Sequence, residues 1–195
     1  MLLLLLFCWK KCCGNEKCAV PDNAAVESVA ESNSPIADNG SSVSITLPDG
    51  RVFEIPKNSP EFELFSFLNS PDAQNDGEQA EKWITLDKVR FDNGKANLAE
   101  GAETQLNNIA NLMQMYPNTN LKVGGYTDNT GNNKINLKVS TERAKVAADK
   151  IIGSGIDAER ITHEGFGSQR PVCPPNDTDE CRAENRRVDI MITRK

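Results

Sequence analysis

Two charged side chains in the segment GGYTDNTGNNKINLKVSTERA, residues 124–144, have types and a spacing that could bind a ligand. Asp128 stands at the exit of a predicted strand, and Arg143 stands in the first turn of a predicted helix, 143 − 128 = 15 positions later. No nucleophile, metal-ligand cluster or phosphate-binding loop lies beside them in the sequence. A fixed carboxylate can hold an ammonium group, and a guanidinium can hold a carboxylate through a fork of two hydrogen bonds. The pair therefore predicts a site for a ligand that carries both charges.

The residues around this pair predict the strands and helices that position it. Apolar residues recur at helical spacing from Ala102 to Met113 and again from Ala144 to Ile152. We expect helices over residues 98–116 and from a cap at Ser140 to a close at Gly153 or Gly155, and strands over residues 83–91, 120–126, 160–166 and 186–193. The order β-α-β-α-β-β predicts an α+β sandwich in which two helices cover one face of a single sheet.

Residues 43–82 predict a small β-hairpin and helix subregion that precedes a main domain of residues 83–195. The stretch VSITLPDGRVFEI, which begins at Val43, alternates apolar and polar residues on both sides of a Pro-Asp-Gly turn. A short helix should follow, with Ser59 as its cap and Pro60 in its first position.

Residues 1–42 predict an anchored arm. Residues 1–18 begin with the apolar run MLLLLLFCWKK, which is shorter than the roughly 20 residues that a membrane span needs. We expect a remnant of a signal or anchor there, and both a lipid anchor and a transmembrane anchor stay open. Residues 19–42 are rich in Ala, Ser, Asn and Pro without an apolar period, so a flexible linker is predicted.

The net charge and the cysteines limit which partners, compartment and metal sites the protein could have. The net charge of −6 argues against nucleic acid as a partner. Cys173 and Cys181 flank the loop PPNDTDE and predict a disulfide in an oxidising compartment, with two free thiols as the alternative. His163 is the only histidine, so the N-terminal cysteines lack partners for a zinc site. No metal and no cofactor are expected.

Five separated motifs occur in a fixed order along the second half of the chain. They are VRFDNG, GGYTDNTG, NLKVSTERA, GIDAERITHEGFG and NRRVDI. Together they resemble the OmpA-like C-terminal domain, a non-covalent peptidoglycan-binding module, over about Trp83 to Lys195. The resemblance implies the same fold as the element order, an OmpA-like sandwich.

The resemblance also implies a binding site. In that family an aspartate and an arginine at the positions of Asp128 and Arg143 grip the diaminopimelate of the peptidoglycan stem peptide. The neighbouring positions line or brace the pocket, or meet another carboxylate of the stem. The implied ligand-binding set is Asp128, Arg143, Thr127, Asn136 and Arg187, with Arg186 as the alternative to Arg187.

The predicted function is therefore a non-enzymatic tether that binds peptidoglycan and fixes a membrane or an envelope complex to the cell wall. Its predicted location is the periplasm, with an N-terminal membrane anchor in the outer rather than the inner membrane. One alternative is a protein-interaction adaptor that docks an envelope complex through residues 43–69. A wall-processing hydrolase would need paired carboxylates such as Asp128 and Glu142, for which the sequence gives no support. The pair Asp128 and Arg143 could also be a plain surface salt bridge.

Overall fold

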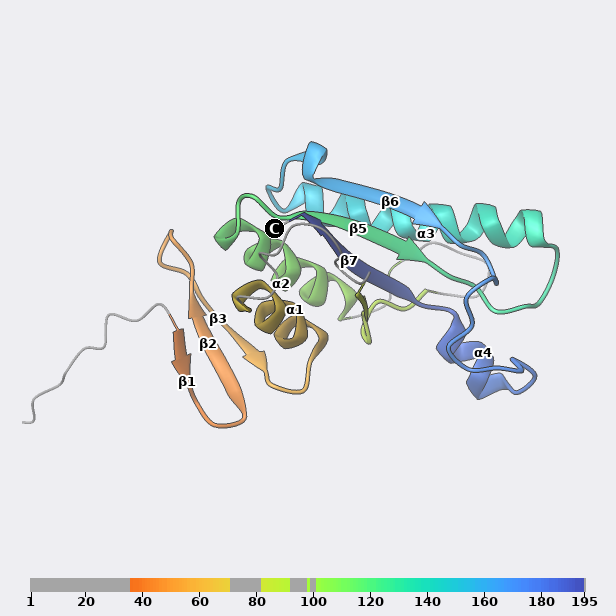
Figure 1. Cartoon of the computed structure of the whole chain (residues 1–195), viewed down its shortest axis with the longest axis horizontal. Coiled ribbons are helices and arrows are strands. Elements are labelled where there is room, and N and C mark those ends of the chain that lie inside the picture. Colours follow the sequence, from red (N-terminus) through yellow and green to blue (C-terminus); the bar gives the residue numbers. More distant parts are fainter. Residues whose placement is uncertain (1–35, 71–81, 92–97, 99–100, 195) are drawn as a thin grey trace, which may run out of the picture. The chain divides into compact units, whose positions relative to one another are not determined.

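A computed structural model of the chain describes residues 36–70, 82–91, 98 and 101–194 (Figure 1). The chain divides into two compact units, Met1–Asn33 and Ser34–Lys195. The first unit lies outside the described residues. The predicted anchor of residues 1–18 and the predicted linker as far as residue 35 therefore lie outside them as well, and both stay predictions.

A three-stranded antiparallel sheet opens the described part of the chain. Its strands are β1 (Ile36–Asp38), β2 (Ser42–Thr46) and β3 (Val52–Pro56), in the order β1-β2-β3. The predicted hairpin is confirmed, since Thr46 pairs with Val52 across a turn in which Gly50 has a φ of +85°. Strand β1 was not predicted. It lies within residues 19–42, for which the sequence predicts a flexible linker.

The short helix α1 (Pro60–Asn69) follows as the sequence predicts. The Ser59 hydroxyl accepts a hydrogen bond from Phe62 N at 3.3 Å, and Pro60 occupies the first helical position. A proline fits there because the first helical N–H has no intrahelical partner.

The rest of the described chain forms the predicted α+β sandwich. Its elements are β4 (Trp83–Thr85), α2 (Ala102–Met115), β5 (Asn120–Gly125), α3 (Asn133–Gly153), a 3₁₀ turn η2 (Ala158–Arg160), β6 (Ile161–Gly165), α4 (Asp179–Asn185) and β7 (Val188–Arg194). The sheet order is β4-β7-β5-β6, with β5 and β6 parallel and the other pairs antiparallel. The elements differ from the prediction in several places: the first strand ends at Thr85 rather than residue 91, α2 begins at Ala102 rather than residue 98, and α4 is an additional helix.

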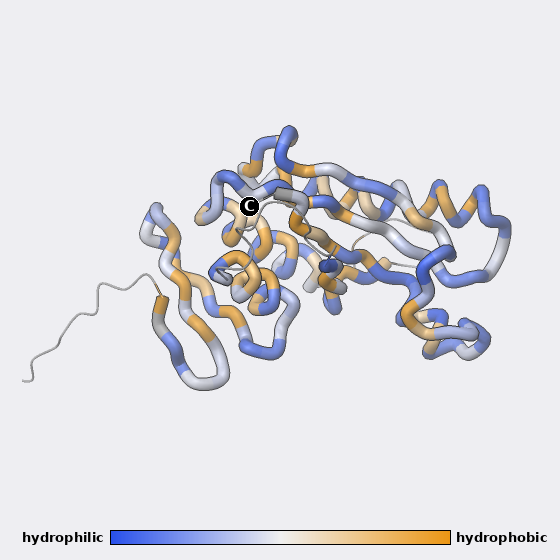
Figure 2. The backbone as a smooth tube through the Cα atoms, in the orientation of Figure 1, coloured by the Kyte–Doolittle hydropathy of each residue, from blue (hydrophilic) through white to orange (hydrophobic). Residues whose placement is uncertain are grey.

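One hydrophobic core joins both sheets and the helices α1, α2 and α3. Figure 2 shows hydrophobic residues along the strands and on the helices, whereas the segment around α4 is mainly hydrophilic. The buried apolar side chains include Ile45 and Ile55 of the first sheet, Leu64 and Leu68 of α1, Leu106 and Ile109 of α2, Leu121, Val123 and Ile190 of the second sheet, and Ala144, Ala147 and Ile151 of α3. The predicted subregion of residues 43–82 and the predicted domain of residues 83–195 thus share a core. No described helix is long and apolar enough to cross a membrane.

Two glycines let α3 approach the sheet closely near the predicted site. Figure 1 shows α3 running along β5 and β6. A Cβ atom on Gly125 would lie 2.1 Å from the Ser140 carbonyl oxygen, and one on Gly165 would lie 2.4 Å from Thr141 N. Because real Cβ contacts are longer than this, larger residues at these positions would push α3 away. The glycines therefore set the distance between α3, which carries Arg143, and the end of β5.

The cap predicted at Ser140 is wrong. Helix α3 begins at Asn133, and the side-chain oxygen of Asn132 accepts a hydrogen bond from Lys134 N at 2.8 Å. Ser140 lies within the helix, where its hydroxyl donates to Leu137 O at 2.9 Å and accepts from Gly167 N at 2.9 Å. The backbone N–H groups near Ser140 are therefore inside a helix, where intrahelical bonds take them up.

Candidate functional site

The Asp128 carboxylate lies in the loop that follows β5. It is 6% exposed, and it accepts hydrogen bonds from Thr130 N at 2.9 Å, from the Thr130 hydroxyl and from Arg186 Nη1 at 2.8 Å. Partial burial alone would raise the pKa of Asp128, but the hydrogen bonds from Thr130 and Arg186 outweigh it and hold the pKa below the usual 3.8. Asp128 is therefore an anion at neutral pH.

The Arg143 guanidinium belongs to the same charge cluster. Arg143 projects from α3, is 2% exposed and lies over the ring of Phe91, with 5.2 Å from Cζ to the ring centroid. Burial lowers its pKa first, the nearby Arg186 lowers it further, and Asp128 raises it. The cluster of Asp128, Arg143 and Arg186 thus carries two positive charges and one negative charge, a net charge of 2 − 1 = +1.

Thr127 and Asn136 lie beside the cluster, as the prediction requires of residues that line or brace a pocket. The Asn136 amide donates to Thr130 O at 3.0 Å and to Asp128 O at 3.4 Å, so it holds the loop that carries Asp128. Thr127 N donates to Gly167 O at 2.9 Å. The buried Thr127 hydroxyl has no hydrogen-bond partner among the described residues. These contacts give Asn136 a bracing role and leave the Thr127 hydroxyl available to another group.

Arg187, the fifth predicted ligand residue, lies in a different environment from Arg186. Its Nε donates to the two oxygens of Asp189 at 3.1 and 3.0 Å, and its Nη2 donates to Arg170 O at 3.1 Å. Its guanidinium lies over the ring of Tyr126, 3.8 Å from the centroid. Burial raises the pKa of Asp189, although the charge of Arg187 acts to lower it. Burial also raises the pKa of Tyr126 to about 12. Of the two neighbouring arginines, the structure places Arg186 against Asp128, and the ligand role of Arg187 stays a prediction.

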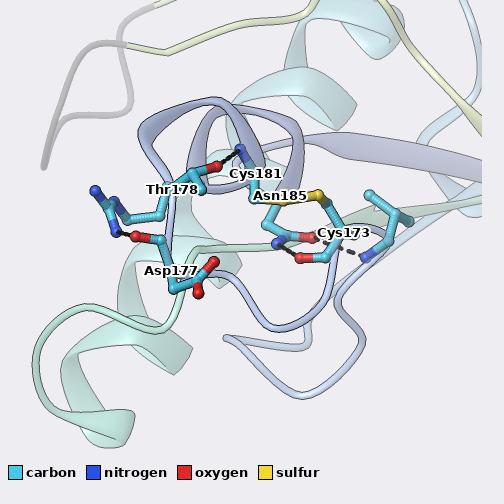
Figure 3. Close-up of a disulfide and its surroundings, with 7 residues drawn as sticks. Cys173, Asp177, Thr178, Cys181 and Asn185 are labelled. Atoms are coloured by element: carbon cyan, nitrogen blue, oxygen red, sulfur yellow. Dashed lines mark hydrogen bonds between the residues drawn. A yellow bond between two sulfur atoms is a disulfide. The ribbon is translucent and has the colours of Figure 1, made fainter.

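The predicted disulfide between Cys173 and Cys181 is confirmed and lies in the segment that leads to Arg186 (Figure 3). The bond spans 8 positions with a Cα–Cα distance of 5.1 Å. Beside it, the Asn185 amide donates to Cys173 O at 2.9 Å and accepts from Cys173 N at 3.2 Å. The disulfide and Asn185 together tie the end of α4 to the preceding loop, and this fixes the backbone from which Arg186 extends.

Among the clefts on the described surface, two lie near regions for which a role was predicted. One of about 740 Å³ lies beside α1, with Lys57, Phe62, Phe67, Lys82 and Asp87 among its lining residues. None of the predicted ligand residues lines it. The other, of about 270 Å³, lies between the start of α3 and the segment after β6, next to Asn136. The walls of the second cleft come from residues 133–137 and 166–169, which are well separated along the chain, so no local sequence pattern marks it.

Comparisons with known proteins match part of the chain to a known family. Residues 90–186 match the model of the OmpA family. The chain is 38% identical over 105 residues to the "Probable lipoprotein YiaD" of Escherichia coli, which covers 54% of this chain and 48% of that protein. It is 37% identical over 109 residues to the "Peptidoglycan-binding protein ArfA" of Mycobacterium tuberculosis, which covers 56% of this chain and 33% of that protein. The chain thus spans less than half the length of these two relatives.

Solved structures give the same result. The C-terminal domain of Helicobacter pylori MotB superposes with a TM-score of 0.51 and 26% sequence identity, and the match covers 55% of this chain and 84% of that domain. The family match falls on the part of the chain that carries the strands and helices of the sandwich. Residues 90–186 therefore form a domain of the OmpA family, as the five motifs predicted.

Proposed function

We propose that this OmpA family domain binds peptidoglycan non-covalently through the diaminopimelate of the stem peptide and tethers a membrane or an envelope complex to the cell wall. The observation that carries the proposal is the buried charge cluster after β5, in which Asp128 and Arg143 come together from a loop and a helix. The proposal draws further support from a relative named as a peptidoglycan-binding protein.

The chemistry of diaminopimelate suits this cluster. The free end of the diamino acid carries an ammonium group and a carboxylate on one carbon. Asp128 would take the ammonium, and Arg143 would take the carboxylate in a fork geometry that lysine does not offer. Each charge-assisted contact contributes on the order of 1.5 to 3 kcal/mol, so one site binds weakly, with a Kd of roughly micromolar to millimolar. The repeated ligands of the wall polymer and a tethered domain raise the effective affinity.

The remaining predicted residues have distinct roles in this proposal. The Thr127 hydroxyl, buried without a described partner, would bond to the ligand, and Asn136 would hold the Asp128 loop in place. Arg186 occupies the Asp128 oxygen that the ligand ammonium needs. On binding, Arg186 would give up part of this contact and turn to another carboxylate of the stem. Arg187 is proposed to act at longer range, since its described partners are Asp189, Arg170 and Tyr126.

The OmpA family domain is a binding module and not an enzyme. The electrostatics of Asp128 agree with this. A glycosidase acid needs a carboxyl group whose pKa is raised, whereas the pKa of Asp128 is lowered. The partner considered for it, Glu142, is exposed on α3 and lies 3.9 Å from Lys138 in an ordinary helical ion pair. The paired-carboxylate arrangement of a hydrolase therefore has no support at this site.

The proposed location is the periplasm, with an N-terminal anchor in the outer membrane. The disulfide between Cys173 and Cys181 favours an oxidising compartment. Relatives named as a probable lipoprotein and as outer membrane porin F favour the outer over the inner membrane. The choice between a lipid and a transmembrane anchor stays open in the proposal.

The cleft beside α1 favours a second candidate function. It is lined largely by residues 57–70, within or beside the region for which a docking role was predicted. In this second candidate function, residues 43–69 would dock an envelope complex while the OmpA family domain binds the cell wall.

The pH dependence of wall binding tests the role of Asp128. Full-length protein is sedimented with purified peptidoglycan of the diaminopimelate type between pH 3 and pH 8. Because the pKa of Asp128 lies below 3.8, its charge is complete at neutral pH and is lost as the pH falls through that pKa. We expect constant binding from pH 8 to about pH 4, with a loss only as the pH falls below the ordinary range of an aspartate.

The ligand's own carboxylates titrate in the same pH range as Asp128. Two variants therefore distinguish the contribution of Asp128 to binding from that of the ligand carboxylates. Asp128→Asn should bind about 10- to 100-fold more weakly at pH 7, because it loses the charge-assisted contact to the ammonium. Asp149→Asn, in an exposed ion pair with Lys145, should bind like the native protein. Equal binding of Asp128→Asn and native protein at pH 7 would contradict the proposed role.

A further inference from the structure

We infer that Tyr126 is a positioning residue for the charge cluster that contains Asp128. The ring of Tyr126 holds together the backbone segments that carry Asp128 and Arg186, and so fixes the carboxylate that takes the ligand ammonium. The inference rests on the proposed function, because it concerns the same site. It adds no contact to the ligand, since Tyr126 acts through Asp128 and Arg186.

Backbone hydrogen bonds bring three segments together at Tyr126. Tyr126 N donates to Arg187 O at 3.0 Å, directly beyond the last residue pair of β5 and β7. Phe166 N, directly after β6, donates to the carbonyl oxygen at the end of β5 at 2.9 Å. Asp128 is two residues after Tyr126, and Arg186 is the residue before Arg187. The two charged residues therefore extend from the point where these segments are joined.

The side chains at this point pack on one another. Tyr126 is 2% exposed, and its ring stacks on the ring of Phe166 with 5.1 Å between the centroids and 16° between the planes. The Arg187 guanidinium lies over the Tyr126 ring, with Cζ 3.8 Å from the centroid. Aromatic pairs and buried cation–π contacts each add to the stability of such a cluster. We call Tyr126, Phe166 and Arg187 the aromatic clamp, because each belongs to a different one of the three segments.

The Arg187 side chain gives the clamp a fixed support. Its Nε donates to the two oxygens of the buried Asp189 at 3.1 and 3.0 Å, and its Nη2 donates to Arg170 O at 3.1 Å. The guanidinium is therefore held in one orientation, and the Tyr126 ring packs against it. Because Arg186 is bonded to Arg187, a shift of the clamp would also move the backbone from which Arg186 reaches Asp128.

The space around the clamp requires a flat ring. A Cβ atom on Gly124 would lie 2.8 Å from Trp83 Cζ3 and 3.1 Å from Phe166 Cε2, so the aromatic layer lies directly on the sheet. Trp83 also meets Tyr126 edge-on, with 6.4 Å between the ring centroids. In such close packing, a smaller side chain at Tyr126 leaves a space that its neighbours fill only in part. Leucine there would also remove the stacking surface from Phe166 and Arg187.

Two variants separate the ring of Tyr126 from its hydroxyl group. Tyr126→Phe keeps the ring and loses the side-chain hydrogen bond with Arg170, whereas Tyr126→Leu removes the ring. Each full-length variant is sedimented with excess peptidoglycan of the diaminopimelate type at neutral pH. We expect Tyr126→Leu to bind about tenfold more weakly than the native protein, and Tyr126→Phe to bind within about twofold of it.

Phe65→Leu controls for a general loss of stability. Phe65 lies in α1, is 7% exposed and packs near Phe62, so this variant removes a buried aromatic ring outside the clamp. It should bind like the native protein. Thermal melting shows whether each variant is folded at the assay temperature. If Tyr126→Leu does not fold, Phe166→Leu removes the stacking partner at a half-buried position and should weaken binding by about three- to tenfold.

A double-mutant cycle distinguishes positioning from an independent effect of the ring. In Asp128→Asn, the charged contact that the clamp positions is already lost. Tyr126→Leu or Phe166→Leu, added to Asp128→Asn, should therefore weaken binding further by less than about twofold. The cycle thus measures whether the ring acts through the Asp128 carboxylate.

Several results would overturn the inference and leave the proposed function intact. They are native-like binding by the folded clamp variant, an equal loss in Tyr126→Phe or Phe65→Leu, and a loss of the same size with and without Asp128→Asn. Absence of binding of the native protein to peptidoglycan would instead overturn the proposed function and the inference together.

Discussion

Arg143→Lys is expected to weaken binding of the full chain to peptidoglycan by about 10- to 100-fold, although the charge is kept. Arg143 is 2% exposed and is held by α3 over the ring of Phe91, so the guanidinium fork has a fixed direction. A lysine ammonium is a compact point charge that cannot form two parallel hydrogen bonds to one carboxylate. Sedimentation with peptidoglycan at several protein concentrations measures the loss.

The control for this variant is Arg182→Lys. Arg182 lies on α4, where it forms an exposed ion pair with Asp179, and the same chemical change there should leave binding unchanged. Thermal melting of both variants shows whether they are folded at the assay temperature. Native-like binding by folded Arg143→Lys would mean that the fork geometry is not used, and the proposed role of Arg143 would be abandoned.

Arg187→Met is expected to lower the free energy of unfolding by about 3 to 5 kcal/mol, because it leaves the Asp189 carboxylate buried without its partner. Arg187 and Asp189 are each 4% exposed at the side chain, and two hydrogen bonds at 3.1 and 3.0 Å join them. Burial raises the pKa of Asp189 even with Arg187 present, so removal of the guanidinium makes the charged form still less favourable. Urea unfolding of the full chain measures the change.

Two further variants make this prediction specific. Arg187→Met combined with Asp189→Leu should be less destabilised than the sum of the single changes, since no unpaired charge remains. Arg186→Met should change stability much less, because its ion pair with Asp128 is partly exposed. A change below about 1 kcal/mol for Arg187→Met would show that the buried pair contributes little, and would make Arg187 available for the predicted ligand role.

The sequence predicts the elements whose signals are local. The cap at Ser59, the proline at position 60 and the turn at Gly50 depend on a few neighbouring residues, and the structure contains each of them. Apolar periodicity similarly predicts α2 and the four strands of the second sheet. Strand β1 and helix α4 have 3 and 7 residues, too few for a periodic pattern to emerge.

The start of α3 could not be predicted from apolar periodicity, for a reason connected with the site. The buried face of its first half carries Asn136, Ser140 and Arg143, and apolar residues take over only from Ala144. Polar residues at and beside the proposed binding site thus occupy the positions where a core would normally mark the helix. The sequence pattern placed the cap of the helix eight positions too late, at Ser140 instead of Asn132.

The candidate site was predictable in its main residues and unpredictable in its arrangement. Asp128 and Arg143 follow from the motifs and their spacing. The choice between Arg186 and Arg187 depends on which face of β7 each approaches, and a shift of one residue exchanges the two. The structure gives Arg186 to Asp128 and Arg187 to Asp189, a distinction that requires the path of the backbone between α4 and β7.

The most direct test of wall binding through an ammonium and a carboxylate compares two kinds of peptidoglycan. In the diaminopimelate type, the free end of the diamino acid carries both groups, whereas in the lysine type the side chain ends in an ammonium alone. Full-length native protein is sedimented with equal amounts of each at neutral pH. We predict at least about tenfold stronger binding to the diaminopimelate type, because Arg143 has no carboxylate to hold in the other. Equal sedimentation with both would contradict the account.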